Sequence, residues 1–353
     1  MKCEGLRRKC EAVRRWLAEI LCCPWCKAEL TLAGAEESGG AVESGRLECS
    51  ACDRPYPITG GVPRFVLGES YAASFGFQWN RFAKTQLDSH SGLPISRERF
   101  FRQTGWGGAE LGGKMVLDVG CGAGRFAEVA LSADADVVAT DCSAAVDACR
   151  RNLGGNERLD VVQGDIYHLP FRPSSFDFIY CFGVLQHTPD VAGAFRALIA
   201  PLRPGGRLAV DVYPKLLRNV LWSKYWLRPF TRRMDQARLF VLAEWMVRRL
   251  LPVSRWLGRM PLAGRYLRYA IPVVNYEGVH PLSESQLLEW SLLDTFDMLS
   301  PVYDRPQTAA TLRKWFQAGG FEQIEVFRNG VLVGRGRKVD APPPGACKHG
   351  SAQ

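Results

Sequence analysis

Short apolar runs, separated by polar and helix-like stretches, dominate the middle of the chain. Met115–Val119 is a run of the kind that forms a buried strand, and similar runs recur up to residue 213. Such alternation is typical of an open, mostly parallel α/β sheet. We therefore predict an α/β core over 114–213, which residues 306–338 complete with a last helix and an antiparallel hairpin.

The segments around this core carry patterns of their own. Residues 1–20 predict a short amphipathic helix with Leu6, Cys10, Val13 and Leu17 on one face. The stretches SYAASFGFQWNRF and ISRERFFRQTGW predict amphipathic helices that lead into the core. The expected divisions are a helical cap at 68–113, a small strand-containing module at 21–67, a helical insertion after the fifth core strand at 214–305, and a disordered tail at 339–353.

Composition places the 353-residue chain among ordinary globular proteins. Hydrophobic residues make up 47% and charged residues 23%, which excludes general disorder. No apolar run approaches the roughly 20 residues that cross a bilayer, and the basic start lacks the apolar core of a secretory signal. We therefore expect a cytoplasmic protein.

Positive charge is concentrated in one segment of the predicted insertion. The chain carries a net charge of +9, and residues 214–272 alone carry +11, from thirteen bases and two acids. Three functional interpretations compete: an anionic small substrate, peripheral contact of 214–272 with the inner membrane surface, and RNA binding. A solvated face of a helical subdomain is the simplest alternative. The position of the insertion, at the carboxyl edge of the sheet, favours a substrate lid.

Four of the twelve cysteines form two CxxC pairs. Cys23 and Cys26 belong to CPWC, and Cys49 and Cys52 belong to CSAC. Two such pairs close a tetrahedral four-thiolate site, for which zinc is the usual ion, and a site without an open position is structural. Only Cys23, not Cys22, has the two-residue spacing to Cys26. A redox CxxC and ordinary core cysteines are the alternatives.

The sequence around these cysteines, CPWCKAEL through LECSACDRPYPITGGVPRFV, resembles the small zinc-ribbon proteins that partner tRNA and protein methyltransferases. The resemblance covers residues 21–67 and is most specific in YPITGGVPRF. It implies a methyltransferase in the same chain.

A glycine-rich turn follows the first core strand in KMVLDVGCGAGRFAE. Nicotinamide enzymes use a similar turn, but here Gly120, Gly122 and Gly124 are spaced more tightly, and Asp118 precedes them. The pattern resembles the first motif of class I S-adenosylmethionine (SAM) methyltransferases. The resemblance implies that Asp118 serves the amino-acid half of the cofactor.

Later motifs extend the resemblance in the family's order over residues 115–213. It implies that Asp141 grips the ribose hydroxyls, that Asp165 contacts the adenine amine, and that Ile166 packs on the ring. Cys142 and Cys181 complete the predicted cofactor contacts, and Gln78 and Trp79 are candidates to line the site. The implied fold is a Rossmann-like seven-stranded class I core with an N-terminal zinc ribbon and a helical lid. A Rossmann-type domain without cofactor is the alternative.

The chemistry of the acceptor is less constrained. No Asn/Asp-Pro-Pro-Tyr/Phe motif and no Pro-Cys nucleophile is present, which disfavours exocyclic nitrogen and pyrimidine C5 methylation. His280, His187 and Tyr303 are the candidate bases, and Asp304 is a candidate anchor of the lid. Thr188 and Pro189 predict the N-cap and first position of a helix, which gives His187 a structural alternative.

The stretch LLDTFDMLSPVYDRPQT resembles a tract in small-molecule methyltransferases of the quinone-biosynthesis type. We therefore predict a SAM-dependent methyltransferase that acts on a small or lipid-linked metabolite at O, N or C. The alternatives are an RNA enzyme resembling zinc-containing ribosomal guanine-N1 methyltransferases and a non-catalytic SAM-binding partner protein.

Overall fold

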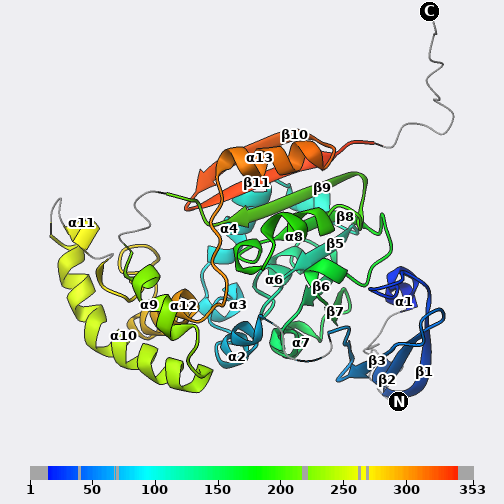
Figure 1. The fold of residues 1–353 in the computed structure, drawn as a ribbon, viewed down its shortest axis with the longest axis horizontal. Helices are drawn as coiled ribbons and strands as arrows, with labels where there is room; N and C mark the ends of the chain where they lie inside the picture. The colour runs from blue at the N-terminus through cyan, green and yellow to red at the C-terminus, as the bar shows by residue number, and fades with distance from the viewer. Residues whose placement is uncertain are drawn as a thin grey trace, which may run out of the picture.

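The computed structural model describes residues 15–38, 41–66, 68, 71–216, 222–260, 264–267 and 270–340 (Figure 1). The N-terminal helix is described as α1 (Arg15–Ile20), with Leu17 buried. Leu6, Cys10 and Val13 of the predicted face, and the predicted tail beyond Asp340, lie outside the described residues.

The N-terminal module is a four-stranded antiparallel sheet. Its strands β1 (Leu30–Ser38), β2 (Ala41–Cys49), β3 (Pro55–Thr59) and β4 (Val62–Pro63) pair in chain order. The two CxxC turns lie before β1 and after β2, so the pairing of Leu30 with Cys49 brings both turns to one end of the hairpin. This arrangement confirms the predicted ribbon.

The central sheet has seven strands in the order β10-β11-β9-β8-β5-β6-β7. The strands are β5 (Met115–Val119), β6 (Asp136–Asp141), β7 (Leu159–Gln163), β8 (Phe176–Cys181), β9 (Leu202–Val212), β10 (Phe321–Asn329) and β11 (Val331–Lys338). Strands β5 to β9 are parallel, and β11 runs antiparallel between β9 and β10. The strand order reverses at β5, where ligands of open α/β sheets bind. The predicted class I core is therefore confirmed.

Helices cover both faces of this sheet because its strands are apolar on both sides. One face packs against α4 (Ile95–Thr104), α6 (Arg125–Leu131) and α7 (Ala145–Leu153), through a core that includes Phe100 and Phe126. The other face packs against α8 (Val191–Ala197) and α13 (Ala309–Ala318), through Phe195 and Phe316.

The start of α8 corrects one local prediction. The helix begins at Val191 with Asp190 at the N-cap position, two residues later than expected. The Thr188 hydroxyl instead donates to the Leu185 carbonyl at 2.7 Å and closes the short 3-10 turn Leu185–His187. A hydroxyl committed to the preceding turn is not available to cap the following helix.

The ribbon covers the free edge of the central sheet next to β7. Arg64 forms a parallel bridge with Gln163, and the Phe65 amide donates to the Gln163 carbonyl at 2.8 Å. The Arg64 guanidinium also contacts Asp147 of α7 at 2.6 Å. Because Tyr56, Ile58 and Phe65 join the same apolar cluster as the core strands, the ribbon and the core share buried surface.

The predicted insertion after the fifth strand is helical. It consists of α9 (Ser223–Thr231), α10 (Gln236–Gly258), α11 (Gly264–Leu267) and α12 (Glu284–Leu299), which lie at the opposite end of the molecule from the ribbon (Figure 1). Asp235 caps α10, and a capping box of Ser283 and Gln286 starts α12.

The insertion has an apolar core of its own. Leu239, Ala243 and Phe296 pack there against Phe77 and Phe82, which belong to α2 (Ala73–Arg81) and the residue after it. Helix α2, with the shorter α3 (Asp88–Ser91) and α5 (Gly108–Leu111), belongs to the predicted cap. Within the described part of the chain, no helix has the length and apolar character to cross a membrane.

Candidate functional site

A cavity of about 980 Å³ lies at the carboxyl ends of the central strands, under α2 and the insertion. Its size is at the upper end of the usual range for small-molecule sites, about 300–1,000 Å³. The lining residues come from the turn after β5, the ends of β6, β8 and β9, helices α2 and α4, and lid helices α9 and α12. The cavity therefore has room for two adjacent ligands.

The glycine turn forms the floor of this cavity. Gly120 and Gly122 have φ angles of 80° and 53°, which favour glycine. A Cβ on Gly120 would lie 2.1 Å from Val184, and a Cβ on Gly122 would lie 3.0 Å from the Trp79 ring. Only glycine lets the neighbouring walls approach this closely. Gly124, the N-cap of α6, does not line the cavity, and a side chain there would meet Leu153.

Asp141 presents a fixed carboxylate to the cavity from the end of β6. It accepts hydrogen bonds from the Gly122 amide at 3.1 Å and from the Ser143 amide and hydroxyl at 2.8 and 2.7 Å. Burial raises the pKa of Asp141, and these donors oppose the rise. A carboxylate has about four acceptor positions, so capacity remains for a ligand hydroxyl.

Asp118 occupies a drier position beneath the turn. It is buried in β5, does not line the cavity, and its Oδ2 atom has no hydrogen-bond partner among the described residues. Burial, with a smaller contribution from the Asp141 charge, raises the pKa of Asp118 to about 8.

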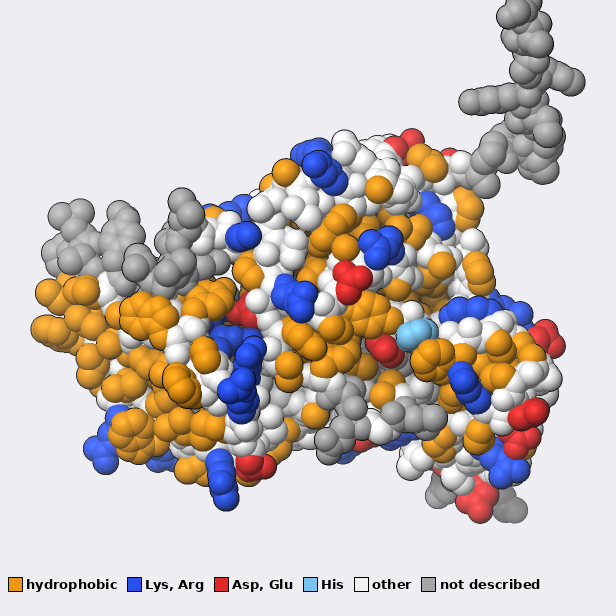
Figure 2. Space-filling model, in the orientation of Figure 1, with side chains coloured by type: hydrophobic (Ala, Val, Ile, Leu, Met, Phe, Trp, Pro, Cys, Tyr) orange, Lys and Arg blue, Asp and Glu red, His pale blue; other side chains and the backbone are white. Residues whose placement is uncertain are grey.

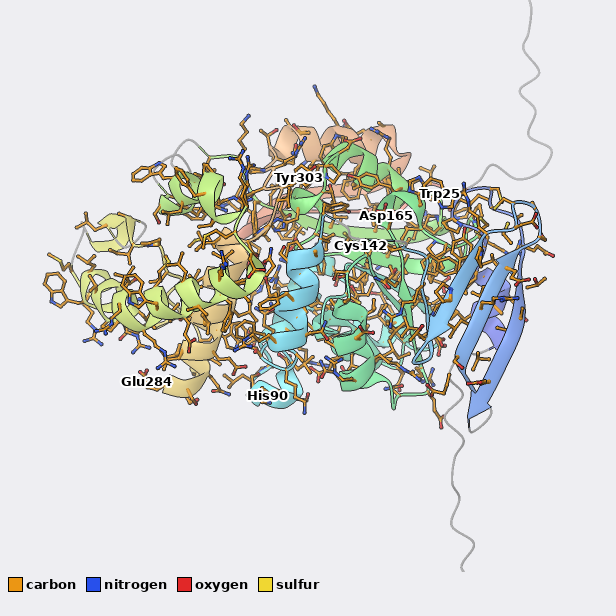
Figure 3. The ribbon with its side chains drawn as sticks, turned by 60° about the horizontal axis from the view of Figure 1, so that its bottom comes forward. Trp25, His90, Cys142, Asp165, Glu284 and Tyr303 are labelled. Carbon is orange, nitrogen blue, oxygen red and sulfur yellow. The ribbon has the colours of Figure 1, made fainter. Side chains whose placement is uncertain are left out.

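The other predicted cofactor residues divide between the cavity wall and the interior. Cys142 and Ile166 line the cavity, while Asp165 and Cys181 do not. The Asp165 carboxylate accepts from the Tyr167 amide at 3.1 Å and thereby caps a short turn. Figure 3 labels Asp165 and Cys142. Cys181 is fully buried in β8, and the residues that follow it reach the wall. Among these positions, the structure therefore supports side-chain contact best at Cys142 and Ile166.

The residues present fit S-adenosylmethionine. Asp141 can accept from a pair of hydroxyls, the glycine turn brings backbone close to a ligand, and Ile166 offers an apolar face. The Asp141 carboxylate at the end of β6 would repel a pyrophosphate. The chemistry of this end of the cavity thus matches a nucleoside joined to a cationic, phosphate-free group.

His187 is buried at the wall and held by the backbone. Its Nδ1 atom lies 2.9 Å from the Tyr303 carbonyl oxygen, and burial lowers the pKa of its imidazole to about 4. His187 is therefore neutral at physiological pH. The Tyr303 ring faces Tyr71 instead of the cavity, so the predicted role of Tyr303 rests on its carbonyl only.

His280 enters the cavity from the insertion, as its position in the sequence predicts. Its ring centroid lies 6.1 Å from that of Tyr276 and 5.8 Å from that of Trp290. Burial lowers the pKa of His280, with help from the Arg125 charge.

Sequence reasoning missed two acids on α12. Asp294 and Asp297 are half-buried and line the cavity. The Tyr276 hydroxyl donates to Asp294, and the Gln78 amide donates to Asp297 at 3.3 Å. The available signal was their spacing, because two acids three residues apart in the apolar helix SLLDTFDML share one face.

Two of the insertion's bases join α9 to the end of α12 and the residues that follow it. Lys224 Nζ lies 2.8 Å from Asp304 Oδ2, and both side chains are buried. Arg228 donates to the carbonyls of Met298 and Pro301 at 3.1 and 2.7 Å. These contacts match the predicted anchoring role of Asp304. They also commit both cations to the protein itself, which weakens the anionic-substrate interpretation for them.

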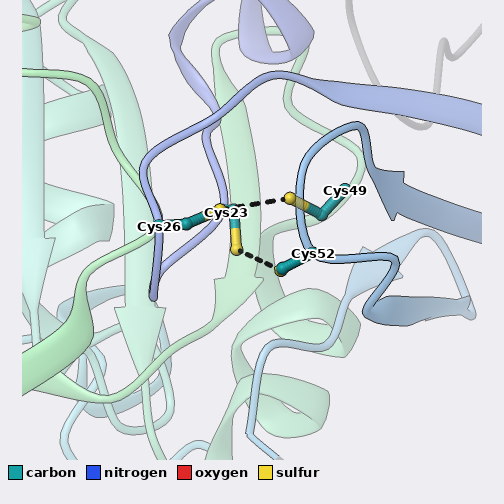
Figure 4. Close-up of side chains that lie close together, drawn as sticks. All are labelled: Cys23, Cys26, Cys49 and Cys52. Carbon is teal, nitrogen blue, oxygen red and sulfur yellow. Dashed lines mark hydrogen bonds between the residues drawn. The ribbon is translucent and has the colours of Figure 1, made fainter.

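The four cysteines of the CxxC pairs converge at the base of the ribbon (Figure 4). Their Sγ atoms all lie within 4.8 Å of one another, with 3.7 Å between Cys23 and Cys52 and 3.3 Å between Cys26 and Cys49. Thiolates about 2.3 Å from one tetrahedral ion lie about 3.8 Å apart.

Burial of Cys23 opposes its ionisation. The backbone N–H of Cys26, the Tyr56 hydroxyl and further donors outweigh this effect and lower the pKa of the Cys23 thiol to about 6. Burial raises the pKa of Cys22, which stays outside the cluster. The cluster therefore has the ligand set and the spacing of a closed metal site.

Two family models match the chain. Residues 117–210 match the model described as a methyltransferase domain, and residues 14–61 match the model described as Trm112p-like protein. The chain therefore carries a methyltransferase domain and a Trm112-like domain, as the sequence resemblances imply.

Similar proteins include a ubiquinone biosynthesis O-methyltransferase of Xylella fastidiosa, 32% identical over 38% of this chain and 60% of its own length. A demethylmenaquinone methyltransferase of Thermobifida fusca is 34% identical over 35% of this chain and 54% of its own length. An uncharacterized Synechococcus protein is 35% identical over 60% of this chain and 48% of its own. The chain thus spans about half to three fifths of these relatives.

Proposed function

We propose that the protein transfers a methyl group from S-adenosylmethionine to a small, quinone-type aromatic acceptor. The observation that carries this proposal is one cavity with two chemically different ends. One end has the glycine turn and Asp141, which fit a nucleoside. The other end has aromatic rings and ionisable side chains from α2, α4, β9 and the lid.

The protein's own residues would act mainly by positioning. Bound SAM supplies an electrophilic methyl group on a sulfonium. The turn and Asp141 fix one reactant, and the insertion encloses the other and excludes water. Orientation of this kind is worth about 7–11 kcal/mol of the barrier. His187, neutral and held by the Tyr303 carbonyl, would support the wall next to the transferred group.

Several features support a small aromatic acceptor over RNA. Phe75, Tyr213 and Trp290 line the acceptor end, and Asp294 and Asp297 add negative charge there. A phosphate backbone would be repelled by these acids. The resemblance to quinone-biosynthesis methyltransferases, at about a third identity, agrees with a ring substrate. The cavity has room for an acceptor beside SAM, which favours a catalytic site over one that only binds SAM.

We further propose that the cysteine cluster holds one structural zinc ion through Cys23, Cys26, Cys49 and Cys52. Four thiolates leave no position open for chemistry. The ion would fix the end of the ribbon hairpin from which β3, β4 and Arg64 extend to the sheet edge. Zinc would thereby stabilise the methyltransferase domain from within the same chain.

We also propose that the outer face of the lid contacts a lipid surface, which would suit a lipid-linked acceptor. Trp226, Phe230, Trp245 and Trp256 are 56–74% exposed on α9 and α10. Exposed bases accompany them, among them Arg232, Arg233, Arg248 and Arg249. Figure 2 shows hydrophobic side chains over this end of the molecule, with bases at its margin. Aromatic and basic side chains on one helical face suit the membrane interface.

Binding and methyl-transfer assays on the purified protein test the central proposal. We expect calorimetry to show SAM binding and no NAD binding, and labelled SAM to pass its methyl group to hydroxylated benzoquinols. Absence of SAM binding would contradict the proposal. Binding without turnover of any acceptor would favour the SAM-binding partner protein, and methylation of ribosomal RNA would favour the RNA enzyme.

A further inference from the structure

The acceptor end of the cavity contains an acid pair that no motif of the methyltransferase core accounts for. Asp294 and Asp297 lie one turn apart on α12 and point into the cavity from the insertion. Both side chains line the cavity and are half-buried.

The two acids differ in how firmly they are held. The Asp294 carboxylate accepts a hydrogen bond from the Tyr276 hydroxyl. The positive charges of Arg125 and Arg99 favour its ionised form. Among the described residues, Asp297 accepts one hydrogen bond, a long one of 3.3 Å from the Gln78 amide. Asp297 therefore keeps acceptor capacity toward the cavity.

A second, independent feature points to a ligand at the same place. Gln78 is fully buried in the cavity wall, and its amide oxygen has no hydrogen-bond partner among the described residues. A buried polar atom without a partner costs about 1–3 kcal/mol. A ligand hydroxyl that donates to the Gln78 amide oxygen would remove that cost.

Asp297 is also close to the point where β8 and β9 end. Burial raises the pKa of Tyr213, the residue after β9, and among the neighbouring charges Asp297 contributes most to the rise. The Tyr213 ring lies 5.4 Å from that of His187. This end of β8 and β9 adjoins the glycine turn through Val184. Asp297 thus belongs to the part of the cavity where the two ligand ends meet.

We propose that Asp297 accepts the proton of a hydroxyl group on the methyl acceptor, so that the site is built for O-methylation of a hydroxylated ring. The inference rests on the proposed function and names its acceptor atom. As the acceptor oxygen forms its bond to the methyl carbon, the bond from that carbon to sulfur breaks and its electron pair stays on sulfur. The hydroxyl proton moves to a carboxylate oxygen of Asp297. Asp294 is a positioning residue that sets the charge around it.

The electrostatic surroundings agree with this role. Burial raises the pKa of Asp297 to about 6, and the pKa of Asp294 also to about 6, in the latter case with help from the Asp297 charge. Both acids are thus largely ionised at pH 7 and ready to receive a proton. The charged and titratable groups that face Asp297 are Lys224 and Arg228 on α9, Asp304 after α12, Asp294 and Tyr213.

The test uses 4-nitrocatechol as the methyl acceptor, with the 353-residue chain and SAM. In the wild type we expect the methylation rate to rise with pH as Asp297 ionises, around a midpoint near 6. Asp297→Asn should lose this pH dependence and slow methylation about 100-fold or more, the usual range for a general base. The methylation rate of the Asp297→Asn variant should recover only at pH values at which the free probe is itself ionised.

Asp294→Asn is the matched control, one turn away on the same helix. Because repulsion between the two charges is mutual, removing the Asp294 charge should move the pH midpoint downward and keep the dependence on Asp297. Wild-type protein that binds SAM but leaves the probe unmethylated overturns the inference, as does an Asp297→Asn variant that matches the wild type in rate and in pH dependence. Loss of SAM binding by the wild type would instead contradict the proposed function.

Discussion

Two carboxylates at adjacent strand ends show how local surroundings separate roles. Asp141 has three hydrogen-bond donors and faces the cavity. Asp118 lies beneath the turn, and one of its oxygens has no partner in the described part of the chain. Donors favour the charged form of a carboxylate, and dry burial favours the neutral form. Asp141 is therefore the residue suited to hold ligand hydroxyls, and Asp118 is suited to shape the turn from below.

Replacing Asp141 with Ala should weaken SAM binding by about 1.5–3 kcal/mol, the range for a hydrogen bond to a charged group. Isothermal titration calorimetry measures the change. Asp136→Ala is the control, because Asp136 starts the same strand and only meets the exposed Arg158 at 3.4 Å. Equal affinities for the two variants would exclude Asp141 from the cofactor site.

The buried imidazole of His187 predicts a dependence of stability on pH. Its folded pKa, about 4, lies below the ordinary value of 6.5, because burial penalises the charged form. As pH falls below 6.5 the unfolded chain binds a proton first, so stability falls until about pH 4. His187→Asn keeps a donor for the Tyr303 carbonyl but cannot titrate.

Between pH 7 and pH 4.5 the wild type should therefore lose about 2–3 kcal/mol more unfolding free energy than His187→Asn. Urea unfolding of both proteins at the two pH values gives the difference. Parallel losses in the two proteins would mean that His187 is not buried in its neutral form.

At the scale of elements, the ribbon covers the edge of the central sheet at β7, as an additional strand would. An uncovered edge strand exposes unpaired backbone groups. Here Arg64 and Phe65 pair with Gln163 at that edge, and their position depends on a hairpin that closes at the four cysteines. Ribbon and core should consequently unfold as a coupled unit.

Cys49→Ser should lose tightly bound zinc, because three thiolates remain of four. The melting temperature of the whole protein should fall with it, since the sheet edge loses its cover. Metal analysis and thermal unfolding test both points, and Cys22→Ser, whose thiol is outside the cluster, should keep its zinc. Full zinc in Cys49→Ser would overturn the ligand assignment, and an unchanged melting temperature would uncouple the ribbon from the core.

The elements themselves were predictable where a period or a spacing encodes them. The buried strands, the glycine turn, the helical insertion and the CxxC ribbon all follow from such local patterns. The pairing of Arg64 with Gln163 was not predictable, because it joins residues 99 positions apart. The start of α8 was predicted two residues early, because nothing local shows that the Thr188 hydroxyl is used by the preceding turn.

The candidate site also contains positions that the sequence predicts and positions that it does not. Asp141 and the glycines stand in a motif with fixed spacing, so the sequence places them. The acceptor end is assembled from Gln78, Tyr213 and Asp297, which meet only through tertiary packing. Asp297 could be suspected only because it is an acid on an apolar helix. Sequence motifs therefore describe the end of the cavity that fits the cofactor far better than the end that fits the acceptor.

At the scale of the molecule, the ribbon and the lid occupy opposite ends, with the cavity between the core and the lid (Figure 1). Val241, Trp245, Pro252 and Trp256 recur on one outer face of α10, at spacings of four, seven and four residues. The inner face of α10 packs on α12, which carries the acid pair. A lid bound to lipid by its outer face would hold the acceptor end of the cavity close to a lipid-linked ring.

Vesicles test this arrangement by co-sedimentation. We expect the wild type to bind vesicles of anionic phospholipid at low salt and to be released at high salt, because a base near such a surface contributes about 1 kcal/mol. A Trp245→Ser, Trp256→Ser double variant should bind less at every salt concentration. Trp25→Ser is its control, because Trp25 is 56% exposed at the ribbon end, beside His168.

Neutralising Arg232 and Arg233 separates the remaining interpretations of the basic segment. If the lid contacts lipid, Arg232→Gln with Arg233→Gln should release the protein from vesicles and spare turnover of a water-soluble acceptor. If these bases instead recognise an anionic acceptor, the same variant should raise KM and leave SAM affinity unchanged. A solvated face predicts that neither quantity moves. We expect the first result, because both arginines are exposed on the outside of the lid, while the acceptor end of the cavity is lined by the acids of α12. Failure of the wild type to sediment with anionic vesicles at low salt would contradict lipid contact.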